Sequence, residues 1–218
     1  PLLFMSYGLA NDIYVTQSGN TLDLDITQDG QNNTVGNSTT SSSSVGATTT
    51  LNIDQIGNSN VITYAINGAT YTGVINLVGN SNNVDLNCDS TGNNSSCGTA
   101  NAVINFTGSS NDIDLDIGQT TSANNADVDI VGQSGSDSNV VAATVDGNSA
   151  ILTITVNGDT NNWLIDIDGN GDVNGHTLIH SHTGGIADVD IVQSGVNDQM
   201  INLTTSGDNH DIDISQTD

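Results

Sequence analysis

The sequence predicts an all-β protein: a flat two-sheet β-solenoid of about eight to nine stacked strand–turn–strand rungs with uncapped ends. Three observations favour this fold. Short segments of alternating apolar and polar residues recur along the 218-residue chain. Isoleucine and valine outnumber leucine by 39 to 13, which is typical of strands. The helix formers Glu, Lys and Arg are absent, and proline, which interrupts sheets, occurs only at Pro1.

The net charge of the chain excludes several classes of binding partner. All 25 acidic residues are aspartates, and the formal net charge is −25. Without a single Lys or Arg, the chain cannot neutralise phosphates, so we expect no nucleic-acid partner and no phosphate-transfer chemistry. No apolar stretch approaches the roughly 20 residues of a membrane span, so we expect no membrane insertion.

Internal repetition is the strongest signal in the sequence. Sixteen alternating segments follow one another, bounded by Gly and Asn, which favour tight turns. We expect strands over residues 11–17, 22–28, 50–55, 60–67, 73–79, 83–88, 102–108, 111–118, 126–132, 139–147, 150–158, 162–169, 177–182, 187–193, 199–205 and 210–216.

The alternation assigns each strand a dry face and a wet face. In residues 111–118, Ile113, Leu115 and Ile117 share one side, and three aspartates share the other. A slip of one residue would bury the aspartates, so the register is well specified.

Asparagines mark the rungs. Strong strand starts are spaced by 22 to 28 residues, which gives two strands per rung; they are Asn11, Asn33, Asn60, Asn83, Asn111, Asn139 and Asn162. The same pattern of alternating strands continues on both sides of the polar stretches 37–50, 88–97 and 168–175, which we interpret as surface loops. We therefore expect residues 11–218 to form a single β-solenoid repeat domain.

Residues 1–10 form a separate apolar segment that lacks the aspartate alternation. Leu2, Leu3, Phe4 and Met5 either cap the first rung locally or pack on a neighbouring subunit, with a signal-peptide remnant as a third interpretation. The last strand brings Ile212 and Ile214 close to the C-terminus, where an uncapped end would invite the next subunit. These six residues are the predicted subunit interface.

The turns follow a more specific pattern. Residues 28–33 and 55–60 both read Q-x-G-x-x-N, and Q-S-G begins at Gln17, Gln133 and Gln193. The predicted turn and ladder residues are Gln17, Gln28, Gly30, Asn33, Gln55, Gly57, Asn60 and Asn111. This pattern loosely resembles the curlin repeat of curli-type extracellular fibre subunits. The resemblance implies stacked strand–turn–strand units with Gln and Asn ladders, through distant homology or convergence. Many repeats keep only G-x-x-N, and the insertions and aspartate rows depart from the short curlin hairpins.

Cys88 and Cys97 bracket a polar loop. A disulfide is the favoured interpretation and indicates an oxidising, extracytoplasmic setting, with two free thiols as the alternative.

Two patterns raise the question of metals. Asp166, Asp168, Asn170 and Asp172 match the start of a calcium loop, but Thr177 stands where the closing Glu is needed. A plain acidic turn is therefore the favoured interpretation. His180 and His182 share a strand face close to His176, which suggests either a polar exposed face or a Zn²⁺ or Cu²⁺ site.

These observations predict a secreted structural protein that polymerises head to tail into extracellular, amyloid-like filaments at a surface or in a matrix. Its partner is itself, and no cofactor is required. The alternative is a calcium-binding β-solenoid adhesin or passenger domain that collects Ca²⁺ or other divalent cations. The paired aspartates belong to repeating solvent-facing rows rather than to a catalytic set, so we expect no enzyme.

Overall fold

The computed structural model describes residues 11–30, 32–36, 42–57, 59–79, 81–88, 97–108, 110–118, 125–133, 135, 138–147, 149–168, 176–195 and 199–217. Within these ranges the secondary structure consists of strands, and every strand pairing is parallel. The strands are β1 (Asn11–Ile13), β2 (Thr16–Ser18), β3 (Thr21–Asp29), β4 (Asn33–Val35), β5 (Ser42–Ile56), β6 (Asn60–Val78), β7 (Asn82–Cys88), β8 (Thr99–Thr107), β9 (Asp112–Ile117), β10 (Asn125–Gly132), β11 (Asn139–Asp146), β12 (Ala150–Asn157), β13 (Asn161–Asp168), β14 (Thr177–Thr183), β15 (Ala187–Ser194), β16 (Met200–Ser206) and β17 (His210–Thr217).

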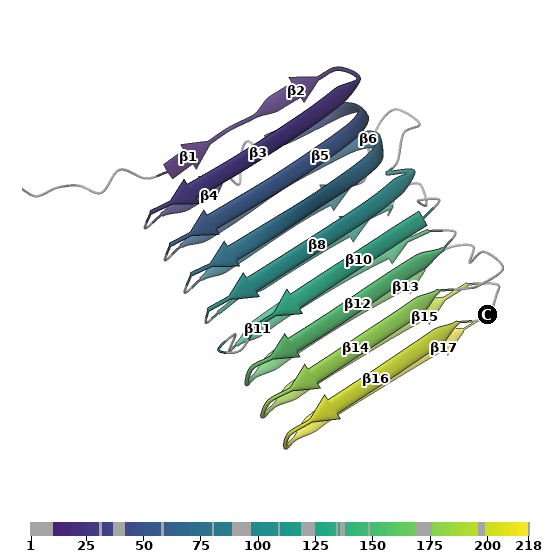
Figure 1. The fold of residues 1–218 in the computed structure, drawn as a ribbon. Coiled ribbons are helices and arrows are strands. Elements are labelled where there is room, and N and C mark those ends of the chain that lie inside the picture. Colours follow the sequence, from purple (N-terminus) through teal and green to yellow (C-terminus); the bar gives the residue numbers. More distant parts are fainter. Residues whose placement is uncertain are drawn as a thin grey trace, which may run out of the picture.

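The strands stack as two facing sheets (Figure 1). The first sheet runs β3, β5, β6, β8, β10, β12, β14 and β16, which is eight stacked segments among the described residues. The second sheet runs β1, β4, β6, β7, β9, β11, β13, β15 and β17. Because the chain alternates between the sheets, the fold is a β-solenoid, and the predicted fold class is confirmed.

The long strands β5 and β6 belong to both sheets. Residues 42–46 of β5 pair with 64–68 of β6 in the second sheet, and residues 48–56 pair with 70–78 in the first. Figure 1 shows both strands curving from one sheet into the other. The sequence predicts a surface loop over residues 37–50, and this is wrong for 42–50. Threonine-rich chain suits a strand, and here its backbone pairs with β2 and β3 on one side and β6 on the other. Residues 37–41 lie outside the described part.

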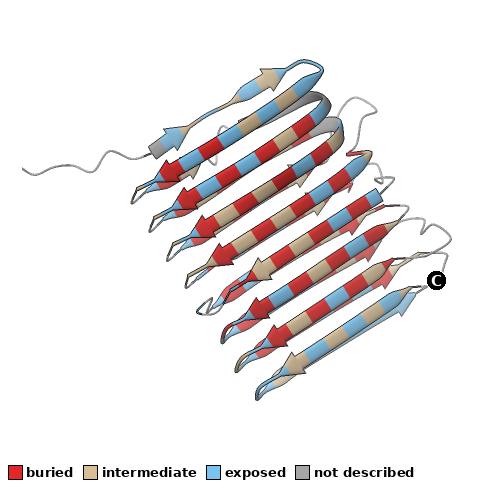
Figure 2. Cartoon of the chain, in the orientation of Figure 1, coloured by how far each residue is buried: buried red, intermediate tan, exposed pale blue. Residues whose placement is uncertain are grey.

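The core is the space between the sheets. Inward and outward residues alternate along each strand, which Figure 2 shows as alternating buried and exposed colours. Aligned inward residues stack into rows that run the length of the molecule. One row of the first sheet contains six buried isoleucines: Ile26, Ile53, Ile75, Ile104, Ile130 and Ile154. Identical side chains stacked in a dry interface resemble the packing of cross-β zippers. Each rung shields the apolar side chains of the next rung from water.

Glycines allow neighbouring rungs to approach at the turns. A Cβ on Gly57 would overlap the carbonyl oxygen of Gly30 in the adjacent rung, and one on Gly79 would overlap that of Gly57. Only glycine permits this stacking of turn on turn. In the first sheet, Gly132 leaves room for the ring of Phe106, whose Cζ would lie 2.7 Å from an added Cβ.

Candidate assembly site: ladders and open edges

A ladder of buried asparagines lies where the chain enters the second sheet. The parallel register aligns Asn82 with Asn111, then with Asn139 and Asn161. Asn82 donates its side-chain amide to Asn111 Oδ1 at 2.5 Å, Asn111 donates to Asn139 Oδ1 at 2.6 Å, and Asn139 donates to Asn161 Oδ1 at 2.5 Å. A primary amide both donates and accepts, so each rung can bond to the rung on either side.

Asparagines of this row also donate hydrogen bonds to the backbone carbonyls of the turns. Asn33 donates to the carbonyls of Gln28 at 3.0 Å and Ile56 at 3.1 Å, and Asn60 donates to that of Gln55 at 3.1 Å. Asn111 donates to the carbonyl of Gly108 at 2.7 Å. A buried carbonyl without a partner would be costly, so each asparagine stabilises the turn before its own strand.

The predicted ladder residues fall in three places. Asn111 lies in the ladder, Asn33 and Asn60 lie in the same row of the second sheet, and Gly30 and Gly57 lie in the turns that precede this row. Gln28 and Gln55 form a buried pair in the first sheet, where Gln55 donates to Gln28 Oε1 at 2.5 Å. Gln17 lies at the edge, where it donates to the carbonyl of Thr21 at 3.4 Å.

Two predicted rung starts are off by one residue. Sequence spacing selects Asn83 and Asn162, but β7 begins at Asn82 and β13 at Asn161. Asn162 is exposed and Asn83 is half-buried on the outward side. The G-x-x-N spacing from Gly79 and Gly158 identifies the inward asparagine correctly, because the turn length sets the phase of the next strand.

The two outer edges of the stack carry inward residues that are incompletely covered. In β16 and β17, Ile201, Leu203 and Ile212 are half-buried and Ile214 is 49% exposed, whereas Ile191 in the adjacent rung is 1% exposed. The opposite edge, formed by β1, β2 and β3, has half-buried inward residues as well (Figure 2). Within the described residues no further strand pairs with either edge. Leu2, Leu3, Phe4 and Met5 of the predicted interface lie outside the described part.

Aspartates occupy the outward positions of both sheets, but amides interrupt their rows. Asn52 donates to Asp25 Oδ1 at 2.8 Å and Asn76 donates to Asp54 Oδ1 at 2.6 Å. Asp85 and Asp114 are direct neighbours in the second sheet. Burial, then the charges of Asp116, Asp85 and Asp112, raise the pKa of Asp114. Carboxylate repulsion is therefore local rather than continuous along the stack.

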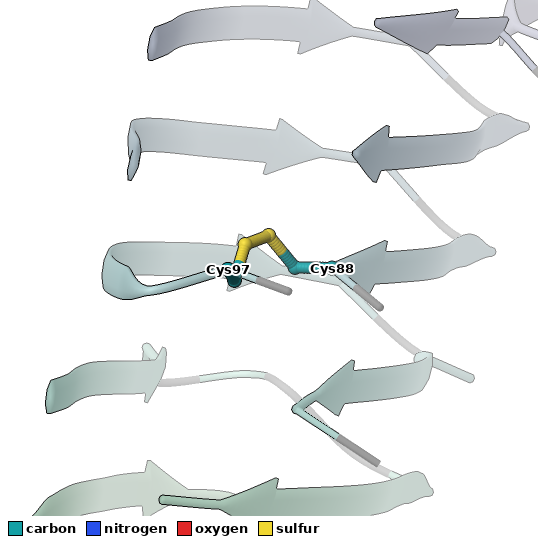
Figure 3. Close-up of a disulfide and its surroundings, with 2 residues drawn as sticks. All are labelled: Cys88 and Cys97. Atoms are coloured by element: carbon teal, nitrogen blue, oxygen red, sulfur yellow. A yellow bond between two sulfur atoms is a disulfide. The ribbon is translucent and has the colours of Figure 1, made fainter. Parts of the chain in front are cut away.

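The cysteines form a disulfide inside the stack (Figure 3). Cys88 ends β7 and Cys97 precedes β8, and their Cα atoms are 5.7 Å apart. Both residues are fully buried, so the bond closes the rung against the core rather than lying on an exposed loop.

The histidines are buried, and the expectation of an exposed polar face is wrong. His176, His180 and His182 are each 0% exposed, because their positions continue the inward rows of β12. His180 meets Trp163 across the core, and His182 meets His210 with ring centroids 5.3 Å apart. Sequence alternation showed that His180 and His182 share a face but not which face is inward.

The structure describes only part of the predicted calcium loop. Asn170 and Asp172 of the calcium-loop pattern lie outside the described residues, as does the side chain of Asp168, and Asp166 is half-buried on β13. In the described part of the chain, no group of three or more His, Cys, Asp or Glu side chains is placed to hold a metal ion. The described residues also include no helix long and apolar enough to cross a membrane.

Comparison with known proteins adds no relative. No protein-family model matches the chain, and no curated protein or solved structure matches it significantly.

Proposed function

We propose that the chain is a structural subunit that stacks end to end into extracellular filaments. The observation that carries the proposal is the incomplete burial of the inward residues on both outer rungs. Rows that are dry in the interior, such as the row of Ile191, reach the edge at Ile214 with half of the side chain exposed. A second copy stacked on this edge would bury the row and pair the free backbone groups of the edge strand.

Whether repeated contacts between subunits close into a ring decides whether the assembly is a ring or a filament. The two edges lie at opposite ends of the stack, so a contact between the first rung of one copy and the last rung of another is head to tail (Figure 1). Such a contact repeats without limit unless rotation closes a ring, and it therefore generates a filament. The curlin-like turns point to the same class of assembly.

Two features favour a location outside the cell. The disulfide between Cys88 and Cys97 suits an oxidising compartment. The absence of Lys and Arg removes every cleavage site for trypsin-type proteases, which suits a fibre that persists in the environment. The high negative charge on outward positions would limit side-to-side clumping while leaving the ends free to join.

Electron microscopy combined with light scattering tests this function. We expect unbranched filaments whose mass grows with protein concentration and time. A homogeneous monomer at high concentration, incubated for days with and without calcium, would contradict the proposal. Calorimetric titration of Ca²⁺ into that monomer would then examine the adhesin alternative directly.

A further inference from the structure

We propose that the outward face of the second sheet, over β11, β13 and β15, is a docking surface for a cationic amphipathic helix of another protein. Val140, Leu164 and Val192 form an apolar stripe on this face, and aspartates flank it. The inference concerns the side of the stack. It therefore goes beyond the proposed filament and does not depend on how the ends of the stack assemble.

The apolar stripe runs diagonally across three neighbouring strands. Val140 is 46% exposed, Leu164 is 54% exposed and Val192 is 43% exposed. Val140 aligns with Asn162, two residues before Leu164, and Leu164 aligns with Asp190, two residues before Val192. Each step crosses one strand and advances two residues, which is about 8 Å, so the whole stripe is about 16 Å long.

The sheet itself does not need apolar residues on its outside. Two earlier strands of the same sheet, β7 and β9, carry only amides and carboxylates at their outward positions, which are Asn83, Asp85, Asn87, Asp112, Asp114 and Asp116. A face directed at water alone is therefore built here without valine or leucine. Exposed apolar side chains that gather on one face, rimmed by polar residues, mark interaction sites.

A hollow lies on this face where the strands begin. Its volume is about 310 Å³, and its lining includes Val140, Ile186 and Asp188. Ile186 is 52% exposed, so two large apolar side chains border the hollow without being covered. An apolar side chain of a partner would fill this space and remove both from water.

A second hollow lies farther along the same strands. Its volume is about 380 Å³, and its lining includes Leu164 and Val192 together with Asp190 and Asp213. Asp188 of the first hollow and Asp190 of the second are two residues apart on the outward side of β15, so the hollows are neighbours. One ligand can therefore occupy both.

Carboxylates flank the stripe on both sides. Asp112 of β9 is the direct neighbour of Val140, and Asp190 of β15 is that of Leu164. Asp190 is in turn the neighbour of Asp213 on β17, and all three aspartates are exposed. A ligand that covers the stripe would bring its own flanks against these carboxylates, so positive groups on those flanks would be attracted.

The charge of the molecule selects the partner. A second copy of the chain cannot supply the positive groups, because the chain contains no Lys or Arg and has a formal net charge of −25. Nucleic acids and anionic membranes carry the same sign of charge as the aspartates and would be repelled. A polypeptide with Lys or Arg beside apolar residues fits both the stripe and its flanks.

The shape of the stripe favours a helix. A length of about 16 Å corresponds to about 11 helical residues at 1.5 Å per residue, or three turns. An amphipathic helix presents its apolar residues as one stripe, and Lys or Arg at the margins of that stripe can reach sideways to the carboxylates. This is the helix-in-groove mode of recognition, with the apolar anchors in the two hollows.

Labelled model peptides test the partner. A peptide of about 14 residues with leucines on one helical face and lysines elsewhere is titrated with the full chain, and fluorescence anisotropy measures the binding. We expect it to bind at least about tenfold more tightly than a peptide with Glu in place of Lys, or one with Gln in place of Leu. Equal binding of the Glu peptide would overturn the role of the aspartates, and equal binding of the Gln peptide would overturn that of the stripe.

A matched pair of substitutions tests the apolar stripe. Leu164→Ser should weaken binding of the leucine and lysine peptide by at least about fivefold. Ile179→Ser, at an exposed outward position on β14 of the first sheet, should leave the affinity within about twofold. Both positions face water, so both variants should keep the circular dichroism of the native chain. Equal effects of the two substitutions would overturn the location of the site.

A second pair of variants tests the flanking charges. Asp190→Asn with Asp213→Asn should weaken binding by about fivefold at low salt and less at high salt. Asp127→Asn with Asp129→Asn removes the same charge from the outward side of the first sheet and should have a smaller effect. Equal losses would show attraction to the net charge alone and would overturn the site. The titrations are made on the dispersed chain, so their outcome is separate from whether filaments form.

Discussion

The imidazole of His180 meets the indole of Trp163 edge to face across the core, with ring centroids 5.0 Å apart and an interplanar angle of 80°. Both side chains are fully buried, and neither ring nitrogen of His180 has a hydrogen-bond partner among the described residues. His180 occupies the row of the six isoleucines, between Ile154 and Leu203. A titratable group thus replaces an aliphatic residue near the C-terminal end of the stack.

We predict that the C-terminal rungs lose stability in mild acid. Burial, and then the charge of His182, lower the pKa of His180 from 6.5 to about 4. The folded state therefore favours the neutral ring, and the stability present above pH 6.5 is lost as the pH falls from 6.5 toward 4. His182 shifts in the same direction, mainly through burial and then His210, with Asp159 opposing.

Replacing His180 with leucine should weaken this acid sensitivity. His180→Leu restores an aliphatic row and removes two unpaired polar atoms, so the free energy of unfolding at pH 5 should rise by about 2 kcal/mol. Denaturant unfolding at pH 5 and pH 7.5 would measure the change, with the outward Ser181→Ala as control. An unchanged pH slope in His180→Leu would contradict the interpretation.

The asparagine ladder should contribute more than the outward asparagines beside it. Asn111→Ala removes the bonds that Asn111 donates to Gly108 and Asn139, and the bond that it accepts from Asn82, so we expect a loss of about 3 kcal/mol. Asn83→Ala, whose amide makes only an exposed 3.4 Å bond to Asp112 among the described contacts, should cost under about 1 kcal/mol. Thermal unfolding of both variants measures the difference. Equal losses would show that the ladder bonds stabilise the fold no more than the outward bond of Asn83 does.

Reduction of the disulfide should destabilise the middle of the stack. The bond closes a short loop with a sequence separation of 9, for which the expected contribution is about 2 kcal/mol. A reductant should therefore lower the melting temperature of the native chain. The double variant Cys88→Ala, Cys97→Ala should melt at the lower temperature and show no response to reductant. Identical melting of native and reduced protein would argue against a structural role for the bond.

Removal of one carboxylate from the second sheet should stabilise the chain at neutral pH. The raised pKa of Asp114 means that its charged form is disfavoured in the folded state, so repulsion persists above that pKa and is relieved as the pH falls through it. Asp114→Asn should gain up to about 1 kcal/mol at low salt, and less at high salt. Asp25→Asn is the matched control, because Asp25 already accepts a bond from Asn52. A gain in stability that does not depend on ionic strength, or that appears equally in Asp25→Asn, would contradict the proposed repulsion between carboxylates.

Local patterns in the chain were sufficient to predict most of the strands, which residues share a face of a strand, and the stacked arrangement. Period-two alternation specifies faces because a strand turns its side chains to opposite sides in succession. The G-x-x-N turns specify where each strand enters the second sheet, as Gly79 and Asn82 illustrate. The spacing between asparagines at strand starts predicted the rung positions less accurately. Asn82 and Asn83, or Asn161 and Asn162, are equivalent in this spacing, and only the length of the preceding turn fixes which one points inward.

Only the tertiary structure decided how distant rungs meet. The row that joins Ile26 to His180 depends on the register of seven successive rungs, and loops of different lengths hide that register in the sequence. The burial of the three histidines, the strand over residues 42–50 and the interleaving of Asn52 with Asp25 arise in the same way. The sequence by itself determined the alternating faces and the turns, because these depend on neighbouring residues. The rows and the partly covered edges were decided by stacking, because a residue's neighbours along a row lie 22 to 29 positions away in the chain.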